Sequence, residues 1–368
     1  MRSTADVVII GAGIVGSSIA WHLKQAGCGD VVLVEKETQP GTGSTAKSMG
    51  GVRAQFALEA DIRMSLYSIA FFRNFACGYR AQGYLFLATD PQHMDMLRAN
   101  VGRQRSLGVD AVKLVSTEEA RAIVPQLETK DVLGGSFCPT DGFVDPHTVT
   151  TAFLQGAELL RETEVTGLDL DGRGIAGVRT SRGSIASRVV VNAAGPWARE
   201  IAAMARVDLP VTPLRRMLVP TEPFDKVTHD APMTVDLATG FHFRPEGLGF
   251  LFAWADPEEA TGAVFVEKIL NQAARRVPVF ANVQVNPSRA WSGLYEMTPD
   301  HHPILGRSPV DGLYLANGFS GHGVMHSPAT GKILADLILK GNTDLIDARA
   351  FDYARFAEGR LIQETAVL

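Results

Sequence analysis

The first residues of the chain alternate between apolar runs and a glycine-rich turn. Asp6–Ile10 has the continuous apolar pattern of a buried strand, the turn Gly11–Gly16 follows, and Ser17–Leu23 has the apolar spacing of a helix. A second apolar run, Val31–Val34, ends in Glu35. This order of elements predicts a strand, turn, helix and strand unit at the start of an α/β fold.

The same patterning predicts both helices and strands throughout the rest of the chain. Helical spacing covers Ile62–Phe75, Pro91–Ser106 and Pro146–Gln155. Short apolar runs predict strands at Tyr84–Ala88, Gly134–Cys138, Val189–Asn192, Phe250–Trp254 and Leu313–Ala316. The runs Glu164–Leu168 and Gly177–Thr180 predict a hairpin, and the turn-punctuated stretch Leu209–Val219 is typical of a separate antiparallel sheet.

Length and composition narrow the class of protein. A chain of 368 residues with 46% hydrophobic content can bury a large core, and we expect two domains. The net charge of −5 and the absence of a basic run argue against a nucleic-acid partner. No run of about 18 uncharged apolar residues predicts a transmembrane helix, although a peripheral membrane contact stays open. The apolar stretch Val7–Ala20 belongs to the glycine motif, so we do not interpret it as a signal peptide.

The three cysteines indicate neither a disulfide framework nor a metal site. Cys28, Cys77 and Cys138 are scattered without metal-ligand spacing, and their odd number favours a reducing, cytoplasmic location. No His, Cys or carboxylate spacing elsewhere predicts a metal ion.

The glycine-rich turns are the candidate ligand-binding motifs of the chain. Gly11 permits a tight turn, Gly13 lets the backbone approach a pyrophosphate, and Gly16 lets helix and strand pack closely. The carboxylate of Glu35 can accept hydrogen bonds from both ribose hydroxyls and favours a free 2′-hydroxyl. A second glycine-rich turn, Gly318–Gly323, stands at the other end of the chain. We therefore expect the two turns to hold the two ends of one long dinucleotide, FAD.

A third segment offers further backbone to such a cofactor. Ser187–Ala198 is a buried strand that enters a turn of small residues, and small side chains let a second stretch of backbone lie against a ligand. Val165, in the predicted hairpin, could offer backbone to an adenine. Each motif alone is also compatible with an ordinary strand and turn.

Together these motifs resemble the FAD-dependent D-amino-acid-oxidase superfamily, most closely the branch of sarcosine oxidase (beta subunit) and the dimethylglycine and proline dehydrogenases. The resemblance covers nearly the whole chain. It rests on the first turn with Glu35, on Gly43-Ser44-Thr45 and Arg53, on Asn192–Gly195, on Leu294–Gly306, and on Gly318–Gly323.

The resemblance implies a Rossmann-like FAD-binding domain beside a substrate domain with a mixed or antiparallel sheet. The FAD-binding domain would comprise residues 1–82, 141–208 and 296–368, and the substrate domain residues 83–140 and 209–295. A helix starting near Ser327 would point its positive end at the pyrimidine edge of the flavin. Compared with this family, the chain is shorter near Cys77, Ala157 and Glu259.

The resemblance also implies a set of cofactor-binding residues and a noncovalent FAD. Relatives attach the flavin through a cysteine, where this chain has Gly293, or through a histidine, where it has Lys47. The expected FAD-binding residues are Gly11, Gly13, Ile14, Val15, Gly16, Glu35, Lys36, Ser44, Thr45, Lys47, Ser48, Gly50, Val165, Ala194, Gly195, Trp197, Gly318, Gly321, His322, Gly323 and Met325.

The implied reaction removes a hydride from the carbon beside an amine and gives an imine. Arg53 is the candidate for binding a substrate carboxylate, because a guanidinium matches a carboxylate. Tyr295 occupies the position where D-amino-acid and glycine oxidases carry an arginine, which weakens the assignment to those enzymes. His322 and His302 are the candidate flavin-facing and acid/base histidines. Each of these four residues could instead have a purely structural role. An apolar substrate cavity could be lined by Phe241, Phe243, Trp254 and Trp291, although these aromatic residues could equally belong to the core.

The electron acceptor and the overall function of the implied enzyme each leave alternatives open. Leu251 replaces the lysine that activates dioxygen in the monomeric oxidases, which favours a dehydrogenase, although Lys47 or His242 could supply a substitute cation. The electron acceptor would be dioxygen, a quinone or an electron-transfer protein. The alternative functions are a flavin-dependent hydroxy-acid or glycerol-phosphate oxidoreductase, or the FAD-binding subunit of a heteromeric dehydrogenase.

Overall fold

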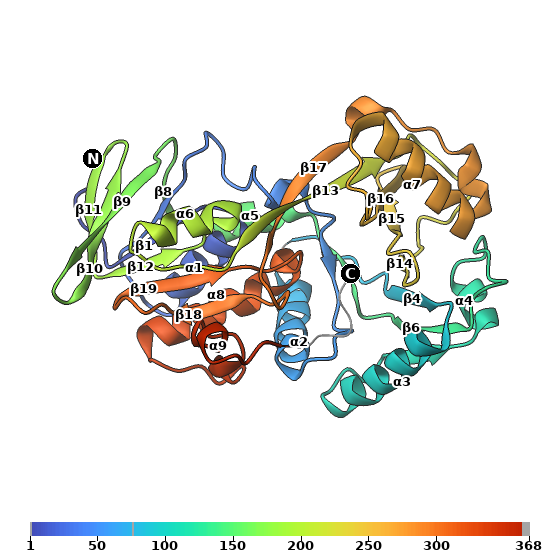
Figure 1. Cartoon of the computed structure of the whole chain (residues 1–368), viewed down its shortest axis with the longest axis horizontal. Coiled ribbons are helices and arrows are strands. Elements are labelled where there is room, and N and C mark those ends of the chain that lie inside the picture. The colour runs from blue at the N-terminus through green and yellow to red at the C-terminus, as the bar shows by residue number, and fades with distance from the viewer. Residues whose placement is uncertain (1, 76, 363–368) are drawn as a thin grey trace.

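A six-stranded sheet forms one half of the molecule in the computed structural model, which describes residues 2–75 and 77–362 (Figure 1). Its strand order is β18-β19-β12-β1-β2-β8. These strands are β1 (Val7–Ile10), β2 (Val31–Val34), β8 (Glu158–Leu160), β12 (Val189–Asn192), β18 (Ile304–Arg307) and β19 (Leu313–Asn317). All neighbours pair in parallel except β18 and β19, which are antiparallel. Every residue of β1 and β2 is buried, as expected for parallel strands covered on both faces.

Helices from both ends and from the middle of the chain belong to this half of the molecule. They are α1 (Ile14–Gln25), α2 (Glu59–Asn74), α5 (Pro146–Phe153), α6 (Ala198–Ala203), α8 (Gly323–Leu339) and α9 (Ala354–Ala357). The helices α1 and α8 approach closely at Gly331, where an added Cβ would lie 2.4 Å from Ser18 Oγ and 2.3 Å from His22 Nδ1. The N-terminal and C-terminal segments therefore share one core.

An eight-stranded sheet forms the other half, in the order β17-β13-β16-β15-β14-β4-β6-β5. These strands are β4 (Tyr84–Ala88), β5 (Lys113–Val115), β6 (Gly134–Cys138), β13 (Thr212–Pro220), β14 (Met233–Asp236), β15 (His242–Glu246), β16 (Gly249–Ala253) and β17 (Trp291–Met297). They are antiparallel except for the parallel pair of β4 and β14. The helices of this half are α3 (Pro91–Ser106), α4 (Thr117–Ile123) and α7 (Gly262–Arg276).

Three of the four aromatic residues considered for a substrate cavity lie in the hydrophobic core of this half. Phe241 and Phe243 are fully buried in the core between the sheet and α7, where they stack on each other and Phe243 packs against Phe280. Trp254 stacks on Phe265 of α7. Their alternation along strands marks the covered face of this sheet, so these three residues are core.

Smaller elements complete the chain. Strands β9 (Val165–Asp171), β10 (Gly174–Thr180) and β11 (Gly183–Ala186) form an antiparallel meander, which confirms the predicted hairpin. The short strands β3 (Gly51–Val52) and β7 (Gly142–Phe143) form a separate antiparallel pair. Short 3-10 helices are η1 (Thr45–Lys47), η2 (Gly195–Trp197), η3 (Pro278–Asn282), η4 (Pro287–Arg289) and η5 (Ala348–Ala350).

The strand patterns predicted from the sequence are confirmed, and one helix start was wrong. The helix expected near Ser327 begins at Gly323, four residues earlier. The pair Ser327-Pro328 is compatible with a helix start, because proline is favoured in the first turn of a helix. In the structure His326 N–H already donates to His322 C=O, so Pro328 lies inside the helix.

The two sheets take their strands from different parts of the chain. The six-stranded sheet uses residues 7–34, 158–192 and 304–317, and the eight-stranded sheet uses residues 84–138 and 212–297. Strand β17 continues through Glu296 and Met297, past the predicted boundary after residue 295. The long strands β13 and β17 run between the two halves (Figure 1). The domain boundaries themselves stay a prediction.

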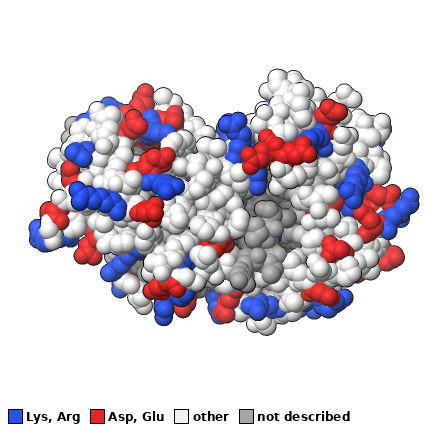
Figure 2. Space-filling model, in the orientation of Figure 1, with Lys and Arg blue, Asp and Glu red and all other residues white. Residues whose placement is uncertain are grey.

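The surface has no dominant charge on the face that Figure 2 shows. Lysine and arginine side chains are interspersed with aspartate and glutamate. Within the described part of the chain, none of the helices combines the length and apolarity needed to cross a bilayer.

Candidate functional site

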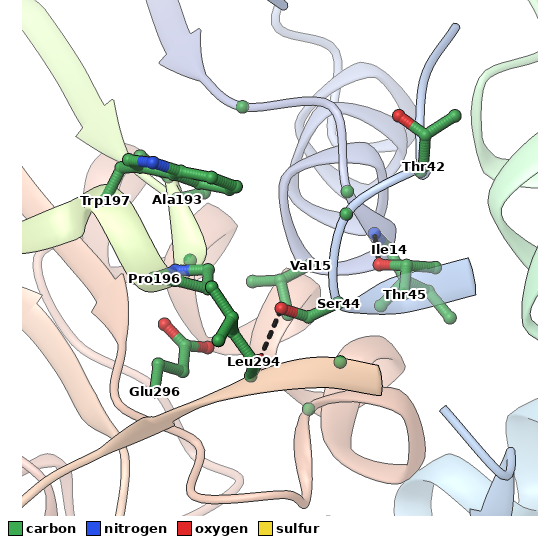
Figure 3. A pocket seen from close by; sticks show the side chains of 18 of the residues that line it. Ile14, Val15, Thr42, Ser44, Thr45, Ala193, Pro196, Trp197, Leu294 and Glu296 are labelled. Carbon is green, nitrogen blue, oxygen red and sulfur yellow. Dashed lines mark hydrogen bonds between the residues drawn. The ribbon is translucent and has the colours of Figure 1, made fainter. Parts of the chain in front are cut away.

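A cavity of about 660 Å³ brings residues from both ends of the chain together. Its volume lies within the range of ligand sites in proteins. Figure 3 shows Ser44 and Thr45 on one side, Pro196 and Trp197 on another, and Leu294 and Glu296 on β17 between them. Gly321 and Gly323 from the C-terminal glycine turn complete the wall. The cavity is therefore assembled from the three motifs that the sequence singled out.

The first glycine turn forms a backbone cradle at the start of α1. Gly11 has φ +100°, and a Cβ there would lie 2.5 Å from the carbonyl oxygen of Ala193. A Cβ at Gly16 would lie 2.0 Å from the carbonyl oxygen of Gly11. Gly11 and Gly13 line the cavity, and α1 begins immediately afterwards at Ile14. The cradle thus presents a helix N-terminus, which is a binding site for a phosphate group.

Glu35 is fixed in position at the end of β2. Its Oε2 accepts a hydrogen bond from Ala12 N–H at 2.9 Å, and its Oε1 accepts one from Glu37 N–H at 2.9 Å. Each carboxylate oxygen keeps a further lone pair for a ribose hydroxyl. Beside it, Lys36 Nζ lies 3.5 Å above the ring of Trp197, which also lines the cavity and is 41% exposed.

The second glycine turn closes the opposite end against β17. Gly321 has φ +98°, and a Cβ there would lie 2.6 Å from Tyr295 Cε2. Ser320 N–H donates to the carbonyl of Glu296 at 3.1 Å. Helix α8 begins at Gly323, so its first N–H groups and its positive end lie at the cavity wall.

The positions at which relatives attach flavin lie next to each other. A Cβ at Gly293 would lie 2.7 Å from Cβ of Lys47, and both residues line the cavity. Nearby, Ser44 Oγ donates to the Leu294 carbonyl at 2.6 Å. Glycine at 293 leaves room for the Lys47 side chain. Neither residue offers the cysteine or histidine nucleophile of the relatives.

Most of the predicted cofactor-binding residues line the cavity, and five do not. Gly16, Gly50, Gly318, His322 and Met325 are absent from the wall. The three glycines act through packing, since a Cβ at Gly50 would lie 2.1 Å from Val144 O and one at Gly318 would lie 2.3 Å from Thr298 Cγ2. Met325 is buried in the core behind the wall.

Arg53 lies buried among aromatic rings behind the cavity wall. It is 1% exposed, and its guanidinium carbon lies 4.3 Å from the ring centre of Phe56 and 5.3 Å from that of Phe86. Its Nη2 donates to Nε2 of His322 at 3.2 Å, because a guanidinium can only donate. His322 therefore carries its proton on Nδ1.

The electrostatic field of Arg53 reaches the tyrosines and histidines around it. Burial and the positive charge of Arg53 lower the pKa of His322 well below its usual range, so the ring is neutral. Burial raises the pKa of Tyr84 and Tyr295, while Arg53 lowers both in part. Burial also lowers the pKa of His242, and the charge of Arg53 lowers it further.

His302 lies in a separate buried cluster and does not line the cavity. Its Nε2 lies 2.9 Å from Asp61 Oδ2, and its Nδ1 donates to the carbonyl of Asp300 at 2.7 Å. Asp300 in turn pairs with the buried Arg355 at 2.7 Å. Both ring nitrogens of His302 thus contact residues of this cluster, at the turn before β18 and outside the cavity wall. The acid/base role of His302 stays a prediction.

Sequence reasoning missed several residues of the wall. Glu296 and Leu294 were seen only as part of a family motif, and Arg216 and Glu200 were not noticed. Arg216 pairs directly with Gly293 across β13 and β17. Only the strand register, which joins positions 216 and 293, could have revealed that contact.

The fold and the cavity define a dinucleotide-binding protein of the Rossmann type, completed by a second sheet. The family described as FAD dependent oxidoreductase (DAO) matches residues 6–337, and the chain belongs to this family. FAD is its cofactor, and the glycine cradle, the fixed Glu35 carboxylate and the long cavity are a fit for that dinucleotide.

Individual relatives cover most of this chain. It is 31% identical over 416 residues to FAD-dependent oxidoreductase domain-containing protein 1 of Xenopus laevis, across 96% of this chain and 82% of the relative. It is 29% identical over 395 residues to the mitochondrial dimethylglycine dehydrogenase of Homo sapiens, across 96% of this chain and 45% of the relative. A crystal structure of L-proline dehydrogenase from P. horikoshii has a TM-score of 0.92 and 33% identity, and the match covers 98% of this chain and 100% of that one. The chain is thus similar to FAD-dependent dehydrogenases of amino acids and amines.

Proposed function

We propose that the protein is a dehydrogenase that oxidises the carbon–nitrogen bond of a small amino acid with a secondary or tertiary amine, such as sarcosine, dimethylglycine or proline. The observation that carries this proposal is Arg53, a buried arginine held behind the wall of the FAD cavity. The similarity to dimethylglycine dehydrogenase and L-proline dehydrogenase supports it.

Arg53 would bind the substrate carboxylate. A planar guanidinium matches a carboxylate in geometry and can donate two parallel hydrogen bonds to it. His322 accepts one of its N–H groups and Phe56 lies against its face, which leaves little rotational freedom. We assign His322 a positioning role toward Arg53, because its Nε2 is already an acceptor for that contact.

Tyr295 and Tyr84 would supply neutral hydroxyl groups near the same carboxylate. Burial raises the pKa of both residues, so both keep their protons at neutral pH. Tyr295 also lines the cavity and packs against Gly321. A hydroxyl at this position can donate a hydrogen bond without adding charge.

The surroundings of Arg53 favour the neutral amine that oxidation requires. When bound, FAD supplies an acceptor for the hydride that the substrate C–H bond releases. The substrate nitrogen contributes its lone pair to the new C=N bond, so an ammonium cannot react. The positive charge of Arg53 and the apolar residues Met49 and Leu218 on the cavity wall both disfavour that ammonium. Water then hydrolyses the imine product.

The apolar environment of Leu251 supports a dehydrogenase in preference to an oxidase. Leu251 is 1% exposed on β16 and packs with Met49 and Leu218. Its strand neighbour Arg244 donates to the carbonyl of Met49 at 2.7 Å and pairs with Glu246. Arg244 is thus engaged in structural contacts, and a fixed cation for superoxide formation is lacking at position 251. We propose a quinone or an electron-transfer protein as the acceptor.

The test is an anaerobic titration that follows the absorbance of oxidised flavin. Sarcosine, dimethylglycine and proline are compared with trimethylamine and pyrrolidine, which lack the carboxylate, and with glycolate and glycerol phosphate, which lack the amine. We expect bleaching by one or more of the three amino acids only, followed by slow reoxidation when air is admitted. Bleaching by glycolate or glycerol phosphate, or immediate reoxidation in air, would contradict the proposal. Absence of turnover with an artificial dye would instead indicate a subunit that needs a partner.

A further inference from the structure

Glu296 is an acidic side chain inside a cavity that must receive an anionic cofactor. It lies on β17, two residues after Leu294, and both side chains point into the cavity (Figure 3). Figure 3 shows its carboxylate directed toward Pro196 of η2. The Oε2 atom is enclosed and has no hydrogen-bond partner among the described residues.

Within the part of the chain that the structure describes, no lysine or arginine compensates the charge of this carboxylate. The titratable residues that line the same cavity include Tyr295 on its own strand, Arg216 on β13, Lys47 on η1 and Glu200 on α6, and His322 stands in the glycine turn outside the wall. None of them shifts the pKa of Glu296. Burial raises that pKa to about 7, and the backbone N–H groups of Gly318 and Phe319 lower it only in part. A carboxyl group with one enclosed oxygen that lacks a hydrogen-bond partner exists readily as the neutral acid at neutral pH.

We propose that Glu296 binds FAD in its protonated form, by donating a hydrogen bond from its carboxyl group to an oxygen of the ribityl–pyrophosphate chain. The pyrophosphate carries two negative charges, and an ionised carboxylate in the same cavity would repel them across a medium that water does not screen. The neutral acid removes that repulsion and supplies a donor for the oxygen-rich chain of the cofactor. Binding of FAD is then coupled to the protonation of Glu296.

This coupling has a definite sign. The cofactor stabilises the protonated form, so the pKa of Glu296 is higher in the complex than in the apoprotein. FAD affinity is therefore constant below the pKa of the apoprotein and falls as the pH rises above it, by up to about tenfold for each pH unit. Glutamine at 296 keeps the shape and an N–H donor but cannot ionise, so its affinity should not change over the same range.

The experiment measures the dissociation constant of FAD by quenching of flavin fluorescence in apoprotein between about pH 6 and about pH 9. Glu296→Gln is the test variant. Glu200→Gln is the matched control, because Glu200 also lines the cavity but is solvent-exposed. Titration calorimetry of the wild type in two buffers with different ionisation enthalpies counts the protons taken up with each FAD, independently of any variant.

We expect the wild type and Glu200→Gln to lose affinity as the pH rises from neutral, the Glu296→Gln variant to remain constant, and the wild type to take up protons above neutral pH. An unchanged pH dependence in Glu296→Gln would overturn the proposal, as would a wild type that takes up no proton. A Glu296→Gln protein that is folded but binds no FAD at any pH would overturn it too, because the amide retains the donor.

Discussion

At the scale of single residues, the proposals for this site depend on two ionisable side chains, those of Arg53 and Glu296. Arg53 is buried and donates a hydrogen bond to His322, and the Oε2 atom of Glu296 is enclosed in the cavity wall. Arg53 is arranged among Phe56, Phe86 and His322, which suits a site for an incoming anion. Burial raises the pKa of Glu296 to about 7, and in its neutral form this side chain does not repel the pyrophosphate of a bound FAD.

The first residue-scale prediction concerns Arg53→Met, which removes the charge but keeps most of the volume. Loss of a buried charge–charge contact costs about 2 to 4 kcal/mol, so KM for the amino-acid substrate should rise about 30- to 1,000-fold. FAD content should stay the same, because Arg53 does not line the cofactor cavity. Steady-state kinetics and the flavin-to-protein absorbance ratio give both numbers.

The matched control is Arg215→Met, an exposed arginine on β13. It should leave KM within about twofold of the wild type, since surface substitutions have small effects. An Arg53→Met enzyme with a normal KM would show that the carboxylate is bound elsewhere.

Residue types and motif spacing were sufficient to predict much of the wall, but not its charge pattern. Gly11, Glu35, Ser44 and Gly321 could be predicted because turn chemistry or a family motif fixes them locally. Arg216 could not, since its place depends on the register of β13 against β17. The contacts of His302 with Asp61 and Asp300 could not be predicted either, because tertiary packing brings Asp61 to it.

At the scale of elements, two glycine turns determine how closely strands and helices meet. Gly16 brings α1 against the turn after β1, and Gly321 brings the start of α8 against β17. The helix α8 begins at the cavity wall because His322 accepts the first helical hydrogen bond, from His326. The strands were predictable from their apolar runs, whereas the family resemblance placed this helix start four residues too late.

The prediction at this scale concerns Gly16→Ala. The added Cβ would lie 2.0 Å from a backbone oxygen, so α1 must shift away from the turn. Such overpacking costs about 1 to 3 kcal/mol or more, and the shift should also weaken FAD binding. Thermal unfolding and FAD titration of the variant measure the two effects.

Gly102→Ala is the control for Gly16→Ala. A Cβ at Gly102, inside α3, meets no atom within 4 Å. Alanine there should stabilise the helix by up to about 1 kcal/mol and leave FAD binding unchanged. If Gly16→Ala behaves like Gly102→Ala, the close contact between α1 and the turn is not required for the cofactor.

At the scale of the whole molecule, the chain folds back so that its first and last parts form one sheet and one cavity. The N-terminal strands β1 and β2 lie in the same sheet as β18 and β19, and α1 packs on α8. The eight-stranded sheet contributes β13 and β17 to the cavity wall. Family resemblance was sufficient to predict a sheet built from both ends of the chain, while the extent of β17 through Met297 depends on its pairing with β13.

The central claim is that this cavity holds one dissociable FAD for each chain. The most direct measurement is the absorbance spectrum of the purified protein before and after acid precipitation, with FAD added first if the protein is colourless. We predict an oxidised-flavin spectrum that moves entirely into the supernatant, because Lys47 and Gly293 offer no point of attachment. Flavin retained in the precipitate would contradict noncovalent binding, and protein that stays colourless with added FAD would contradict the cavity as the cofactor site.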